Sequence, residues 1–226
     1  NTLLLNVLDL LFSFPMPIIL ALLLNEIRVK WFKRVTQTLL YLPHFLSWVV
    51  IGATAYAMFA TNSGVINTLI ANAGKSPIPF LQEDAWWLFS YILIGIWQTM
   101  GWGTIIYLAA ITNVNSELYE AAKVDGANRW QQCLHVTLPC IRSTIVVMLI
   151  MQLGKLMGGS FERIVALSNA KATEYTTTIP VLVYKWFQGN KFSESTALGL
   201  FQSVIGVILV VASDKIAKKL GEDGLL

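Results

Sequence analysis

The sequence predicts an all-α membrane protein, a polytopic bundle of helices, and two observations lead to this fold class. Hydrophobic residues make up 55% of the 226 residues and charged residues only 13%, whereas a soluble domain is about 25% charged. Five windows also reach the length of about 20 mostly apolar residues that a bilayer-crossing helix requires. This composition excludes a disordered tail and argues against a soluble enzyme.

The five predicted spans follow one another along a single transmembrane domain that takes up residues 1–226. They are Leu3–Leu24, Thr38–Ala60, Ala85–Ile111, Ser143–Phe161 and Thr196–Ser213. The second, third and fifth contain no Asp, Glu, Lys or Arg, whereas the first contains Asp9 and the fourth contains Lys155. Pro15 and Pro43 are compatible with membrane helices, because neighbouring helices can satisfy the carbonyls that a proline frees.

The distribution of Lys and Arg between the spans predicts the orientation in the membrane. If the segment after the first span is cytoplasmic, ten such residues lie inside and five lie outside. The outer five are Lys75, Arg163, Lys171, Lys185 and Lys191. Cytoplasmic loops are enriched in Lys and Arg, so we expect a multi-pass protein of the cell membrane with residues 112–142 and the C-terminus in the cytoplasm.

Several function classes find no support in the residues. The net charge of +3 gives no basic field for a phosphate backbone, so no nucleic-acid partner is expected. Cys133 and Cys140 with His135 between them do not form a metal-ligand pattern, so no metal site is expected. Because the sequence has no phosphate-binding glycine-rich loop, ATP and Mg are expected on another chain, and this chain is predicted to be no enzyme and to bind no cofactor itself.

The polar stretch at residues 112–142 is too long for a simple connection between helices, which takes about 2–8 residues. Asn115 or Ser116 can cap a short helix, and Gly126 can end it in the left-handed conformation. A second amphipathic piece leads to Pro139, which fits at the start of the next helix. Composition alone would also allow a solvated loop whose alanines favour helix.

One spacing in this loop is specific, namely Glu120-Ala121-Ala122, then Gly126, then Val136 and Leu138-Pro139. It resembles the cytoplasmic signature of binding-protein-dependent ABC importer permeases, in which an Ile stands where this chain has Val. The resemblance implies a helical bundle of the type I ABC importer permease kind. It also implies that the seven residues Glu120, Ala121, Ala122, Gly126, Val136, Leu138 and Pro139 belong to the element that couples to a cytoplasmic ATPase subunit.

Resemblance to one branch of this family extends along the chain, through Tyr41–Val50, Gly101–Ile111 and Gly199–Gly206. These runs look like the oligosaccharide and polysaccharide uptake branch. The resemblance implies a carbohydrate substrate, a second permease subunit, two cytoplasmic ATPase subunits and an extracellular solute-binding protein. Family members carry six spans, so we expect an N-terminally truncated chain with five of them. The segment Glu174–Pro180 departs from the more acidic pattern of the branch, which leaves the contacts of that outer loop open.

Polar and aromatic residues at membrane depth are candidates for a substrate pathway, because they are costly in the bilayer. Gln98 lies near the centre of the third span beside Trp97, and Trp48 and Gln152 fall at similar depth in two other spans. An indole can stack on the apolar face of a sugar ring, and an amide can donate to and accept from its hydroxyls. Alternatively, such a Trp anchors the interface and such a Gln bonds a neighbouring helix. Lys155 can extend its ammonium toward the interface and is assigned no role.

Other functions remain open at this point. A permease for a peptide or an amino acid would share the coupling loop and differ in its binding protein. A membrane scaffold or insertase without transport would have no ATPase partner. A membrane enzyme would need a catalytic constellation that these residues do not supply.

Overall fold

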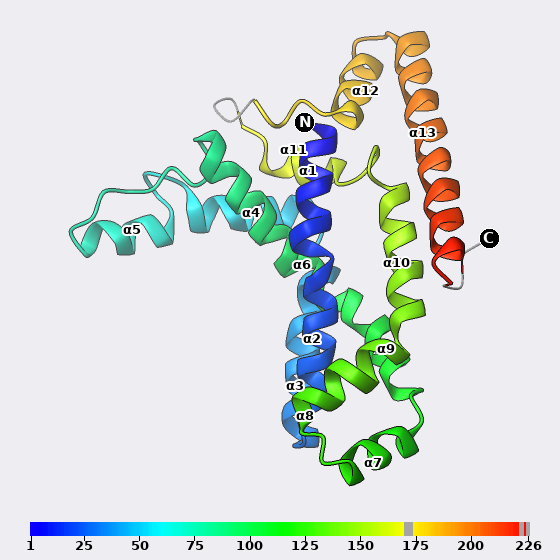
Figure 1. Cartoon of the computed structure of the whole chain (residues 1–226). Helices are drawn as coiled ribbons and strands as arrows, with labels where there is room; N and C mark the ends of the chain where they lie inside the picture. Colours follow the sequence, from blue (N-terminus) through cyan, green and yellow to red (C-terminus); the bar gives the residue numbers. More distant parts are fainter. Residues whose placement is uncertain (170–173, 222–223, 225–226) are drawn as a thin grey trace.

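The computed structural model describes residues 1–169, 174–221 and 224, and within these ranges it contains helices and turns but no strand. The expected Lys171 of an outer loop lies outside the described residues. Figure 1 shows a bundle of upright helices, with α7 at one end and α12 beside the N-terminus at the other. This arrangement confirms the predicted all-α class and places α7 and α12 at opposite ends of the bundle.

Three helices are long and apolar enough to cross a membrane without interruption, and they coincide with the first, third and fifth predicted spans. The first runs over Thr2–Glu26 as α1 (Thr2–Leu8), a π-helical turn η1 (Asp9–Ser13) and α2 (Pro15–Glu26). The other two are α6 (Asp84–Thr112) and α13 (Phe192–Lys219). With a rise of about 1.5 Å per residue, each exceeds the apolar thickness of a bilayer.

The π-helical turn η1 lies directly before Pro15, and its position has a steric reason. A proline inside a helix has no N–H and its ring clashes with the carbonyl four residues earlier. A wider turn relieves this clash, and the Phe14 N–H accordingly donates to the Asp9 carbonyl, five residues back, at 3.1 Å. A second π-helical turn, η3 (Cys133–Thr137), precedes Pro139 in the same way. Both prolines are thereby kept inside continuous helical segments.

The second predicted span, Thr38–Ala60, is not a single helix. The structure forms α3 (Lys30–Tyr41), a 3₁₀ turn η2 (Leu42–Phe45) and α4 (Trp48–Phe59), and the two arms meet at 103°. Pro43 lies in the 3₁₀ turn, Leu46 is extended, and the Ser47 hydroxyl then caps α4 by accepting from the Val50 N–H at 3.4 Å. That the bent pair crosses the membrane as one span stays a prediction.

The fourth predicted span, Ser143–Phe161, is also interrupted. Helix α10 (Arg142–Gly154) ends early, and a turn over 155–160 brings the chain to α11 (Phe161–Leu167). Ser160 takes the left-handed conformation at φ 63°, which few non-glycine residues adopt. Before α10, the segments α8 (Arg129–Gln132), η3 and α9 (Leu138–Cys140) form one helical arm at 61° to it. Pro139 therefore lies in the arm, and the span helix starts only at Arg142.

The segments between the predicted second and third spans and between the fourth and fifth contain two further short helices. Helix α5 (Val65–Asn72) lies in an arm that extends away from the bundle, and α12 (Ile179–Gln188) packs against α13 (Figure 1). The Glu174–Pro180 segment contacts the start of α1, since the Ile179 N–H donates to the Thr2 hydroxyl at 2.8 Å. The segment is therefore held against the first span.

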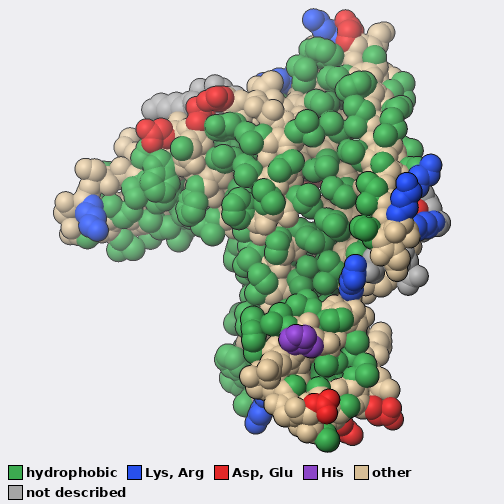
Figure 2. Space-filling view, viewed as in Figure 1, with side chains coloured by type: hydrophobic (Ala, Val, Ile, Leu, Met, Phe, Trp, Pro, Cys, Tyr) green, Lys and Arg blue, Asp and Glu red, His purple; other side chains and the backbone are tan. Residues whose placement is uncertain are grey.

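Helix α6 is the centre of the fold, because it contributes to both clusters of buried apolar side chains. One cluster joins α6 to α1, α4 and α11 through Leu5, Ile51, Trp87, Tyr91, Ile94, Ile164 and Leu167. The other joins it to α2 and the end of α9 through Ala21, Leu24, Tyr107, Leu108, Ile111 and Ile141. Figure 2 shows hydrophobic side chains over most of the upright face, with charged side chains near its ends and beside the C-terminus. Such a surface is typical of a protein in contact with lipid.

Candidate functional site

A cavity of about 420 Å³ brings together residues from segments far apart in the sequence. Its walls come from the first span, the bend between η2 and α4, the C-terminal half of α6, α10, and the turn before α11. Trp48, Gln98 and Gln152, three of the four predicted pathway residues, line it together. Their contact with a substrate stays a prediction, but the structure places them on one cavity.

The fourth predicted residue, Trp97, is 42% exposed and lies outside the cavity lining. Neighbouring residues on a helix point about 100° apart, and of this pair only Gln98 faces the cavity. Trp102, four residues after Gln98, shares its face and does line the cavity. The imidazole of His44 stacks on its indole with ring centroids 4.6 Å apart and planes 7° apart. Trp102 was predictable from the sequence, because a residue four positions after Gln98 lies on the same face of a helix.

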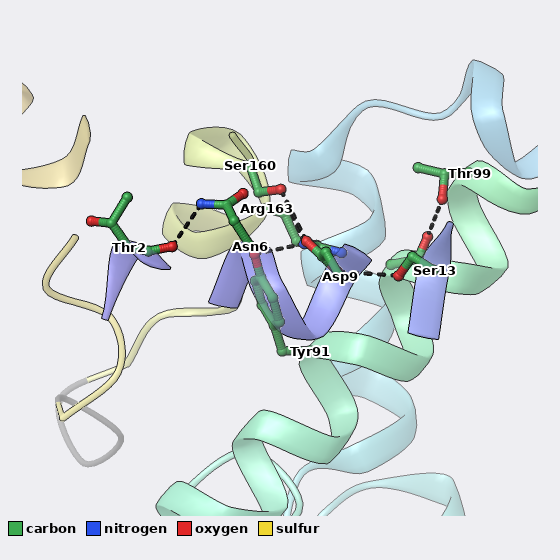
Figure 3. A network of polar contacts seen from close by, with 9 residues as sticks. Thr2, Asn6, Asp9, Ser13, Tyr91, Thr99, Ser160 and Arg163 are labelled. Carbon is green, nitrogen blue, oxygen red and sulfur yellow. Dashed lines mark hydrogen bonds and ion pairs between the residues drawn. The ribbon is translucent and has the colours of Figure 1, made fainter. Parts of the chain in front are cut away.

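A buried ion pair lies in the wall of the cavity, between the first span and α11. The Asp9 carboxylate accepts from the Arg163 guanidinium, and both side chains are almost fully buried. The same Arg163 nitrogen donates to the Tyr91 hydroxyl at 2.6 Å and to the Ser160 hydroxyl at 3.0 Å. Figure 3 shows Asp9 at the centre of this network, with Ser13 donating to its other oxygen at 3.1 Å. The π-helical turn η1 presents both Asp9 and Ser13.

Arg163, which the charge count places among the outer cations, is buried inside the protein, and its side of the membrane stays a prediction. It is 3% exposed, and its guanidinium lies over the Tyr91 ring at 3.8 Å from the centroid. Gly95 makes this position possible, because a Cβ there would come within 1.7 Å of the Arg163 Nη1 atom. The sequence signal for a buried cation was Asp9, since a carboxylate in an apolar span needs a cationic partner. Lys155, to which no role was assigned, also lines the cavity.

Residues 112–142, the predicted coupling loop, form the helix-turn-helix that their sequence predicts. Helix α7 (Ser116–Val124) is capped by Asn115, whose side chain accepts from the Glu117 N–H at 3.0 Å. Gly126 follows at φ 80°, the left-handed conformation expected for a glycine that ends a helix. Asn128 and Gln131 then form a reciprocal capping box at the start of α8. Each end of the turn is therefore fixed by local hydrogen bonds.

The seven predicted coupling residues divide between an exposed and a half-buried set. Ala122, Gly126 and Val136 line one shallow groove of about 350 Å³ between α7 and η3. Leu138 packs against the buried cluster of α2, α6 and Ile141. The exposed members are Glu120, Ala121, Gly126 and Pro139. The structure thus brings the two halves of the motif together and leaves part of it on the surface.

Two contacts hold the loop against the rest of the chain. Tyr119 and Thr137 share a hydrogen bond of 2.9 Å between their hydroxyls, which joins α7 to η3. Arg129 pairs with Glu26 at the end of α2, at 2.5 Å, although both side chains are about half exposed. Burial raises the pKa of the neighbouring Cys133 thiol, and the Glu26 carboxylate acts in the same direction. The loop is therefore attached to the end of the first span.

The family model described as binding-protein-dependent transport system inner membrane component matches residues 13–220. The chain belongs to this family. The resemblance that the loop motif carried is therefore confirmed, and with it the fold of a type I ABC importer permease. Members of this permease family are transport subunits of the inner membrane.

Relatives and a solved structure match over the full chain. The polygalacturonan/rhamnogalacturonan transport system permease protein YteP of Bacillus subtilis (strain 168) is 46% identical, over 100% of this chain and 70% of its own length. Protein LplB of the same organism is 43% identical, over 100% of this chain and 71% of its own. The crystal structure of a bacterial alginate ABC transporter, in complex with an alginate pentasaccharide-bound periplasmic protein, matches with a TM-score of 0.95 and 38% identity, over 100% of this chain and 78% of that chain. The permease family is thus supported by sequence and by structure.

Proposed function

We propose that this permease is one of two transmembrane subunits of an ATP-driven importer that carries an oligosaccharide into the cell. The other permease subunit is either a second copy of this chain or a related one. Two cytoplasmic ATPase subunits and an extracellular solute-binding protein complete the assembly. The solved relative, an ABC transporter in complex with a periplasmic protein, supports this composition.

The cavity is the observation that carries the proposal for the substrate. It combines the indoles of Trp48 and Trp102 with the amides of Gln98 and Gln152. Aromatic faces stack on the C–H faces of sugar rings, and amides exchange hydrogen bonds with their hydroxyls. Two relatives whose names state a polysaccharide or an oligosaccharide, YteP and the arabinooligosaccharide permease AraP of Bacillus subtilis, favour the same substrate class.

The coupling loop supports the proposed energy source. Its exposed motif, Glu120 to Gly126, would lie in a cleft of an ATPase subunit on the cytoplasmic side, where the C-terminus also lies. ATP and Mg would be bound entirely by that subunit, because the permease sequence has no phosphate-binding loop. Closure of the ATPase dimer would move the loop and thereby favour one of the two orientations of the pathway. The hydrogen bond between Tyr119 and Thr137 connects α7 to the arm before α10. The ion pair between Arg129 and Glu26 connects the loop to the first span.

The test is Gly126→Leu in the assembled transporter, reconstituted in vesicles with its ATPase and binding protein. No atom lies within 4 Å of a Cβ at Gly126, so the variant costs only about 1–2 kcal/mol of left-handed strain while it places a branched side chain on the exposed turn. We expect oligosaccharide uptake to fall by about tenfold or more, the effect of a contact worth about 1.4 kcal/mol. Gly221→Leu is the matched control, because Gly221 has φ 78° and equally open surroundings.

Three outcomes would contradict the proposal. Unchanged uptake with Gly126→Leu would remove the coupling role from the loop. If a peptide-loaded binding protein stimulates ATP hydrolysis and a sugar-loaded one does not, the substrate is a peptide and not a sugar. Purification of the permease with no P-loop ATPase bound would favour a scaffold without transport.

A further inference from the structure

The cavity lining carries an unequal number of positive and negative charges. Asp9, Lys155 and Arg163 are its residues with a full charge at neutral pH. The single carboxylate, Asp9, is already paired with Arg163. Lys155 has no ion pair or hydrogen bond to its side chain within the part of the chain that the structure describes. One positive charge is therefore left without a counterion on the wall of the cavity.

Lys155 and Arg163 come from the same local structure. Lys155 is the C-cap of α10, and Arg163 lies in the first turn of α11, at the far side of the turn over 155–160. A lysine at a helix C-terminus is favourable for the helix dipole, which would explain Lys155 as a stabilising residue only. That explanation does not account for its place on a cavity that also contains Trp48, Trp102 and two glutamines.

Arg163 provides an independent second observation. Its Nη2 atom makes the three hydrogen bonds described above, whereas its Nε atom is buried and has no partner among the described residues. A buried donor without an acceptor is rare, and such a group marks a place where a ligand or water is expected. Contacts with the Tyr91 and Trp48 rings hold the guanidinium in place. The cavity therefore has one fixed and one mobile cationic group on one wall.

We propose that this wall recognises a carboxylate on the substrate, with Lys155 as the residue that determines selectivity for an acidic sugar over its neutral counterpart. The inference rests on the proposed function, since it assumes that the substrate is an oligosaccharide. A lysine ammonium on a flexible chain can follow a carboxylate through the cavity as a point charge. The indoles meanwhile stack on the ring of the sugar, so that charge and ring are recognised by different residues.

The experiment compares two substrates in the complete transporter with its binding protein, an oligogalacturonate and the same oligosaccharide with its carboxylates methyl-esterified. The variants are Lys155→Gln, Lys155→Arg and, as a matched control, Lys215→Gln, an exposed lysine of α13 away from the cavity. The preference of the binding protein is the same for all permeases. It therefore cancels when the ratio of acidic to esterified uptake is compared between variant and wild type.

We expect Lys155→Gln to lower this ratio by about tenfold or more, the effect of losing one hydrogen bond to a charged group. Uptake of the ester should stay near the wild-type value, Lys155→Arg should keep the preference, and Lys215→Gln should change neither. An unchanged ratio in Lys155→Gln, or an equal loss for both sugars, overturns the role of Lys155 while sugar uptake by the wild type still upholds the proposed function. If the wild type transports neither sugar, the inference fails, whereas the proposed function fails only if no oligosaccharide is transported.

Discussion

The buried pair of Asp9 and Arg163 gives the sharpest prediction for stability. Their side chains are 7% and 4% exposed, so solvent does not screen the pair as it screens a surface salt bridge. Asp9→Leu leaves the Arg163 charge buried without compensation, and removal of one partner of such a pair costs about 3–5 kcal/mol. With a change in Tm of about 2–4 °C per kcal/mol for chains of this size, the Tm should fall by about 6–20 °C.

The assay is thermal unfolding of the purified transporter in detergent, followed by tryptophan fluorescence. The double variant Asp9→Leu, Arg163→Met should recover most of the loss, because replacement of a buried ion pair by apolar residues is often neutral. Asp125→Leu is the control, since Asp125 is exposed on the coupling loop and such substitutions stay within about 0.5 kcal/mol. Equal Tm values for Asp9→Leu and Asp125→Leu would refute the reasoning, as would a double variant less stable than either single one.

Two further predictions concern packing and pH. Gly101→Ala should destabilise the folded protein by about 1–3 kcal/mol, because the new Cβ would lie 1.9 Å from the Leu40 carbonyl oxygen. In the control Gly199→Ala the new Cβ meets no atom within 4 Å, so its stability should be unchanged. Equal thermal stability of the two variants would contradict the packing argument. Since burial raises the pKa of Cys133, less thiolate is present at a given pH, and the alkylation rate of the Cys140→Ser variant should reach half its maximum at higher pH when folded than in denaturing detergent. A midpoint that is equal or lower in the folded protein would show the pKa reasoning to be wrong.

Much of the fold is predictable because its signals are local. A run of about 20 apolar residues is sufficient for a membrane helix, so both α6 and α13 were predictable; the predicted ends of α6 are close to those observed, whereas α13 extends beyond its apolar run at both ends. The cap at Asn115 and the left-handed Gly126 are likewise decided within a few residues. Pro43 was visible too, but the sequence did not say that the chain would turn by 103° beside it. A proline removes one hydrogen bond, while the packing of neighbouring helices sets the angle.

The candidate site likewise divides into residues that the sequence predicts and residues that only the structure places. Depth in the predicted spans and residue type were enough to select Gln98, Gln152 and Trp48, which the structure brings to one cavity. They could not exclude Trp97, because a helix that is apolar on all sides does not reveal which face is buried. Nor could they place Arg163, whose position depends on Asp9, 154 residues earlier in the chain.

The sequence by itself determined the membrane class, the number of apolar runs and the coupling motif, since each depends on composition or on short spacings. Only the tertiary structure decided that α10 stops at Gly154, that Arg163 is buried beside Asp9, and that Lys155 has no ion-pair partner among the described residues on the cavity wall. The physical reason is that charge pairing acts through space. A buried ion pair forms between whichever segments the fold brings together, and no local pattern in the sequence records that partner.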